Sequence, residues 1–179
     1  MSQPTPAERR FVDHLVALTD PRRQDGRGAL AALRRGLGKP PGTVAEMFPV
    51  VGPFDPGGTG WDSDRYYLVA SLFGSHPDNW DYRGGDDRSS NLGASLRLAN
   101  RESGGVQAAL TALLNSGRDE LPDRLRHCIA LCGAARPPAA VDWAQLLHDL
   151  RWWDSARRDT QRRWATSFWQ PRREGENEE

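Results

Sequence analysis

Apolar residues recur along this chain at the spacing of α-helices, three or four positions apart. In the segment 29–39, Leu30, Leu33 and Leu37 form one apolar stripe, and glycines near the end of the segment favour a helix stop. No segment shows the alternating β-branched residues that are typical of a strand. The pattern therefore predicts an all-α fold of about eight helices.

Capping and breaking residues set the expected bounds of these helices. A Ser, Thr, Asp or Asn before an apolar run favours a helix start, whereas Gly and Pro favour an end. The helix that begins at Asp62 or Ser63 is apolar over most of its circumference, so we expect it at the centre of the core. Other helices are expected at about residues 5–19, 29–39, 43–48, 91–98, 103–114, 120–133, 141–153 and, after a cap at Asp154 or Ser155, up to 169.

The distribution of polar residues divides the chain into three expected parts. Residues 1–88 form an N-terminal helical half that ends in a long acidic loop, and residues 89–170 form a C-terminal helical half. A chain of 179 residues is long enough for these halves to pack as two lobes. We expect residues 171–179 to form a disordered acidic tail.

Charge is segregated along the chain, although its formal net charge is zero. Basic residues dominate positions 20–39, and carboxylates dominate positions 55–87. The N-terminus lacks the basic and apolar regions of a signal peptide, and no apolar run is long enough to span a membrane. We therefore expect a cytoplasmic protein without membrane contact, in which Cys128 and Cys132 are reduced thiols buried in the core.

The sequence carries none of the common catalytic or nucleotide-binding motifs, such as a Walker loop or a zinc-protease helix. His127, Cys128 and Cys132 supply three ligands on one helix, which does not complete a structural zinc site. We expect no metal, no cofactor and no enzymatic activity. A metal-dependent enzyme that uses Asp86 and Asp87 is the least favoured alternative, because catalytic carboxylates need a rigid frame.

Basic side chains lie on helix faces away from the apolar stripe. In the 29–39 helix, Arg35 and Lys39 lie opposite the leucines, and Arg27 and Arg34 lie on the flank, where Arg34 could also pair with a carboxylate. The second half repeats this design with arginines at helix ends and on polar faces. Cations spaced along helices can follow a phosphate backbone without reading bases.

Tryptophans are frequent in the C-terminal part and permit two interpretations. Exposed indoles could stack on nucleobases. However, Trp143, Trp153 and Trp164 have the helical spacing of core residues, which is the favoured interpretation for these three.

Several segments together resemble one known family. They are residues 30–36, 67–73, 91–96, Leu125-Arg126, 141–153 and 164–169. In order, spacing and chain length they are similar to the CasB family, the small subunit of the type I-E CRISPR Cascade surveillance complex. The segment 103–107 departs from the family, which often has charged residues there, including arginine. A nucleic-acid contact from that helix start is therefore less expected.

The resemblance implies an all-helical, non-enzymatic protein that pairs with a second copy beside the crRNA-bearing backbone and the other Cascade subunits. Family members contact the target and displaced DNA strands of the R-loop through basic surfaces. The alternative is a helical adaptor that binds only proteins. The predicted nucleic-acid contacts, with Arg27, Lys39 and Arg124 included from the charge pattern, are Arg27, Arg34, Arg35, Lys39, Arg101, Arg118, Arg124, Arg126, Arg157, Arg158 and Arg162.

Overall fold

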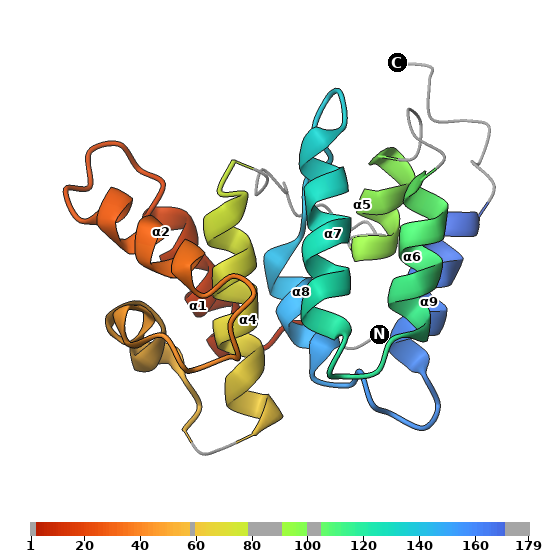
Figure 1. Cartoon of the computed structure of the whole chain (residues 1–179), viewed down its shortest axis with the longest axis horizontal. Helices are drawn as coiled ribbons and strands as arrows, with labels where there is room; N and C mark the ends of the chain where they lie inside the picture. Colours follow the sequence, from red (N-terminus) through yellow and green to blue (C-terminus); the bar gives the residue numbers. More distant parts are fainter. Residues whose placement is uncertain (1–2, 58–59, 79–90, 100–104, 171–179) are drawn as a thin grey trace.

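The computed structural model describes residues 3–57, 60–78, 91–99 and 105–170, and all regular structure within these ranges is helical (Figure 1). The all-α prediction is confirmed for this part of the chain. The elements are α1 (Pro6–Ala17), α2 (Gly26–Arg35), η1 (Ala45–Met47), α3 (Phe48–Val51), η2 (Gly52–Phe54), α4 (Trp61–Ser75), α5 (Leu92–Ala99), α6 (Gly105–Asn115), α7 (Leu121–Ala134), α8 (Trp143–Leu150) and α9 (Asp159–Trp169).

Two predicted helix bounds are wrong. α2 begins at Gly26 and ends at Arg35, so Lys39 lies in the turn after the helix and not on its outer face. α8 ends at Leu150, and α9 begins only at Asp159. The reason for the late start of α9 is local: residues 151–157 form turns, and Arg158 has a φ of 53°, a left-handed conformation that cannot continue a helix.

α4 is the central helix of the N-terminal half, as its apolar circumference predicts. Its residues from Arg65 to Gly74 are all buried, and it packs against α2, α7 and α8. The contact with α2 is close because Gly74 has no side chain: a Cβ at this position would lie 2.7 Å from Leu33 Cβ. This close packing leaves the polar face of α2 directed to solvent.

The C-terminal half is built from two helix pairs, α5 with α9 and α6 with α7. Gly93 permits the first pair to approach, because a Cβ there would clash with the carbonyl oxygen of Trp164. Trp143, Trp153 and Trp164 are buried, so the core interpretation of these three tryptophans is confirmed.

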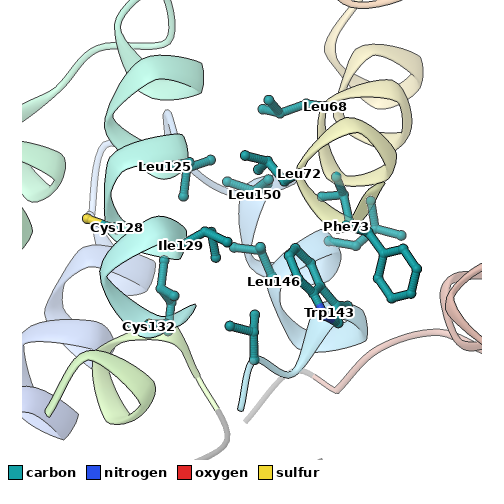
Figure 2. Close-up of a cluster of buried hydrophobic side chains, with 14 of the residues drawn as sticks. Leu68, Leu72, Phe73, Leu125, Cys128, Ile129, Cys132, Trp143, Leu146 and Leu150 are labelled. Atoms are coloured by element: carbon teal, nitrogen blue, oxygen red, sulfur yellow. The ribbon is translucent and has the colours of Figure 1, made fainter. Parts of the chain in front are cut away.

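The two halves meet in a continuous hydrophobic core formed by α4, α7 and α8 (Figure 2). Leu72 of α4 lies toward Leu125 and Ile129 of α7 in this cluster, and the Phe73 ring packs edge-on against Trp143 of α8. α8 packs against α1 and α4 although it belongs to the second half of the sequence. α2 and α7 both pack against α4, which holds the basic turn after α2 near the start of α7.

Candidate nucleic-acid interface

The first basic group lies at the end of α2. Leu33 is fully buried against α4, so the next two residues, Arg34 and Arg35, point away from the core and are exposed. Arg35 Nη1 lies 3.5 Å from the Glu46 carboxylate in an exposed pair. Arg27 and Arg34 have no carboxylate partner among the described residues, so the expected surface position of both is confirmed.

The turn after α2 lies against the start of α7. Gly38 has a φ of +74°, and a Cβ at this position would lie 3.2 Å from Arg126 Nη1. Residues of the same turn and Pro122 of α7 line one small pocket. Lys39 follows Gly38 directly and is exposed. The turn after α2 and the start of α7, which come from different halves of the sequence, therefore lie side by side.

The arginines of α7 form exposed ion pairs with carboxylates close by in the sequence. Arg124 lies 3.8 Å from Glu120, and Arg126 lies 3.2 Å from Asp123. Exposed pairs at these spacings contribute only about 0.3–0.5 kcal/mol, so a phosphate can replace the carboxylate at little cost.

Arg118 has more contacts within the protein than Arg124 and Arg126. Its guanidinium lies 4.7 Å from the ring centre of Trp61 and forms an ion pair with Asp154. The indole N–H of Trp61 donates a hydrogen bond of 2.6 Å to the carbonyl oxygen of Leu150. Arg118 thus links the start of α4 to the turn after α8, and this structural contact competes with a role in binding.

The predicted cations at the start of α9 do not act as one group. Arg158 precedes the helix and donates to the carbonyl oxygen of Leu114 at the end of α6, so it does not share a helix face with Arg162. Arg157 is 85% exposed and has a loose contact of 3.9 Å with Asp159. Arg162 is exposed on α9. Arg101 lies outside the described residues.

A buried charge network joins α1, α4 and α8, and no sequence pattern marked it. Glu8 Oε1 accepts a hydrogen bond of 2.7 Å from Arg65, and Glu8 Oε2 lies 2.9 Å from His148 Nδ1. Burial of Glu8 opposes ionisation, but hydrogen bonds from His148, the Thr5 backbone and Arg65 lower its pKa to about 2. The Thr-x-x-Glu spacing of Thr5 and Glu8 indicates a capping box, which α1 has, but not the burial of its carboxylate.

A second buried carboxylate, Asp149, follows His148 in α8. It accepts hydrogen bonds from Gln145 at 2.7 Å, Arg163 at 2.7 Å and the Trp164 indole at 2.6 Å. The adjacency of His148 and Asp149 on a helix favours a partnered surface or half-buried histidine over a catalytic one, whereas in the structure His148 is partnered and both residues are buried. These groups are used within the fold and are not presented to a ligand.

The described residues hold no group of three or more potential metal-ligating side chains. Cys128 and Cys132 are free and buried, and burial raises the pKa of each thiol to about 12, so both are neutral core residues as expected. Asp86 and Asp87 lie outside the described residues. No helix in the described part of the chain has the length and apolar character needed to cross a membrane.

Comparison with known proteins places the chain in one family. The family model for the CRISPR-associated protein Cse2 matches residues 29–169. A CRISPR-associated protein Cse2 of Thermus thermophilus is 34% identical over 171 residues, which is 92% of this chain and 90% of that protein.

Solved structures agree with this match. The crystal structure of CasB from Thermus thermophilus is 31% identical, with a TM-score of 0.72, and the alignment covers 92% of this chain and 97% of that one. A chain of a CRISPR RNA-guided surveillance complex shares the fold at 23% identity and a TM-score of 0.70, over 90% of this chain and 91% of that one. The chain therefore belongs to the CRISPR-associated Cse2 family, also called CasB, whose members are structural and not catalytic proteins.

Proposed function

We propose that this chain is the small subunit of a type I-E CRISPR Cascade complex in the cytoplasm, where it binds nucleic-acid backbones without sequence preference and stabilises the crRNA-guided R-loop. Other Cascade subunits, crRNA and the target and displaced DNA strands are its partners, and it self-associates as a pair. Membership of the Cse2 family supports this proposal.

The observation that carries the proposal is the set of exposed cations at the end of α2, in the turn after it and at the start of α7, which that turn contacts. Arg34 has no carboxylate partner among the described residues, and Lys39 follows the glycine that contacts Arg126. The other cations of this set, Arg35, Arg124 and Arg126, form only exposed ion pairs. Formation of an R-loop exchanges one duplex for another of similar stability, so a few backbone contacts are enough to shift the balance.

A salt titration with the full chain tests the proposal. We expect binding to single- and double-stranded DNA and RNA of scrambled sequence, with log affinity falling linearly with log salt. The Arg34→Ala/Arg35→Ala variant should weaken binding to all sequences alike and reduce the slope by about 1.8 on duplex, at about 0.9 per phosphate contact. An unchanged slope in this variant would contradict the assignment.

The chain offers a matched control for this variant. Arg9 and Arg10 also form an adjacent, exposed arginine pair, but they lie on α1. The Arg9→Ala/Arg10→Ala variant removes the same charge and should keep the wild-type salt slope. An equal loss in both double variants would indicate a general charge effect and not a binding surface.

A helical adaptor without direct nucleic-acid contact is the second candidate. The specific observation in its favour is that Arg118, Arg124 and Arg126 already form ion pairs within the chain. This candidate predicts no binding to nucleic acid at low salt, together with clear co-purification with the other subunits.

A further inference from the structure

One indole remains exposed on a turn whose backbone is fixed. Trp152 is 50% exposed, although its neighbours Leu150 and Trp153 are buried. Its backbone N–H donates to the Asp149 carbonyl oxygen at 3.1 Å, and its own carbonyl oxygen accepts from the Ser155 N–H at 3.0 Å. The exposure of this ring is therefore a feature of an ordered turn and not of a frayed helix end.

The same turn is tied to other parts of the molecule on both sides of Trp152. The Trp153 indole donates a hydrogen bond of 3.2 Å to the Ser116 carbonyl oxygen in the turn after α6. The Trp61 indole donates to the Leu150 carbonyl oxygen at 2.6 Å from the start of α4. A ligand that packs on Trp152 would not have to order this backbone, which lowers the entropic cost of binding.

Guanidinium groups accompany the aromatic rings on this surface. The Arg151 guanidinium lies 5.5 Å from the ring centre of Trp152, and the Arg118 guanidinium lies 4.7 Å from that of Trp61. Indole faces and guanidinium planes are the two kinds of surface on which proteins stack unpaired nucleobases.

The local charge also favours a polyanion. The segment 151–162 contains four arginines and two aspartates, which leaves two positive charges in excess. Including Arg118 and Asp62, which form ion pairs with this segment, does not change the excess. Arg157 is exposed in the same run of turns as Trp152, and Arg162 is exposed near the start of α9, so both are available to neutralise phosphates of a bound strand.

We propose that Trp152 stacks on an unpaired nucleobase of a single strand whose phosphates contact Arg157 and Arg162. This inference rests on the proposed function and adds that Trp152 is a contact residue and that its ligand is a single strand. A duplex keeps its base faces stacked inside the helix, so Trp152 contributes to binding of a single strand and not to binding of an intact duplex. Stacking on an indole requires no particular base, which agrees with binding that is independent of sequence.

The test measures affinity of the full chain for a labelled oligothymidine strand and for a blunt DNA duplex by fluorescence anisotropy at low salt. Trp152→Ala should weaken binding of the single strand by about 5- to 100-fold and leave duplex binding unchanged. Trp152→Phe keeps an aromatic face and should retain most of the affinity. Thermal unfolding of each variant establishes that the fold is intact.

Trp169 supplies the matched control. It is 46% exposed at the end of α9 and packs edge-on against its neighbour Phe168, but no cation lies over its ring among the described contacts. Trp169→Ala should bind both ligands like the wild type. An equal effect of the two alanine variants on the single strand would overturn the assignment to Trp152.

The outcomes separate this inference from the proposed function. If the wild type binds with the expected salt dependence but Trp152→Ala is unaffected, stacking is overturned and backbone binding stands. If the wild type binds neither ligand, the proposed function fails and the stacking site fails with it. Loss of co-purification with partner subunits, without a change in single-strand affinity, would assign Trp152 to a protein contact and also overturn stacking.

Discussion

Two regions of this protein use the same kinds of side chain in opposite ways. Where α1, α4 and α8 meet, Glu8, Arg65 and His148 are almost fully buried, and the Glu8 carboxylate accepts a hydrogen bond from Arg65 and lies 2.9 Å from His148 Nδ1. At the end of α2 and in the turn after it, Arg34 and Lys39 are exposed and have no carboxylate partner among the described residues. Burial distinguishes the charges that hold the fold from the charges that are free to bind.

The physical difference is the cost of losing a partner. A buried charge that loses its counter-charge cannot be hydrated, whereas an exposed one exchanges its partner for water at little cost. The buried network also connects the two halves of the sequence, because Glu8 and Arg65 come from the first half and His148 from the second. The exposed group can give up its weak contacts to phosphate.

The largest effect is expected from breaking the buried network. Glu8→Ala leaves Arg65 and His148 buried without their carboxylate, and we expect the free energy of unfolding to fall by about 3–5 kcal/mol. Urea unfolding of the variant and the wild type measures this loss. Glu46→Ala, which removes an exposed carboxylate, is the control and should change stability by less than about 0.5 kcal/mol. A similar small loss in both variants would mean that burial does not separate the two regions.

The pH dependence of stability sharpens the comparison. Glu8 has a pKa of about 2 in the folded chain, below its ordinary value of 4.5, so the unfolded chain binds the proton more readily. This carboxylate stabilises the fold fully above about pH 4.5 and progressively less as the pH falls towards 2, with a total of about 3 kcal/mol. Urea unfolding across this window should show the loss in the wild type.

Glu8→Gln removes the ionisable group and provides the reference for that pH series. Its stability should depend less on pH between 4.5 and 2, although it is lower than that of the wild type at neutral pH. Parallel pH profiles for the two proteins would show that Glu8 does not carry this dependence.

The smallest effect is expected at the exposed pair of Arg35 and Glu46. Their closest side-chain atoms are 3.5 Å apart and both side chains are more than half exposed. A double-mutant cycle with the two alanine variants should give a coupling energy between 0 and about 1 kcal/mol that decreases with added salt. A coupling of several kcal/mol would place this pair with the buried network and remove the contrast between the regions.

The periodic spacing of apolar residues was enough to predict most helices. It identified the central position of α4 and the buried tryptophans, because both depend on the face that each residue occupies on a helix. It was wrong at residues 36–39 and 151–158, where the ends of helices depend on backbone conformation. The left-handed φ of Arg158 is an example, since arginine gives no local signal for that conformation.

The candidate site was predictable only as a set of residue types. Sequence alone indicated that Arg35 lies opposite the leucine stripe and Arg34 on its flank, since that follows from helix geometry. It could not show that Gly38 lies close to Arg126, that Arg118 stacks on Trp61, or that Arg158 bonds to the end of α6. These contacts join residues far apart in the sequence.

The sequence by itself thus determined the all-α fold class, the apolar face of each helix and the positions of the arginines along the chain, because each follows from local spacing and composition. The tertiary structure decided which charges are buried and which are exposed. Glu8 and Glu46 are the same residue type, each near the start of a helical segment, yet one is buried against Arg65 and His148 and the other is exposed to solvent. The physical reason is that hydration of a charge depends on which helices pack over it, and long-range packing sets that arrangement.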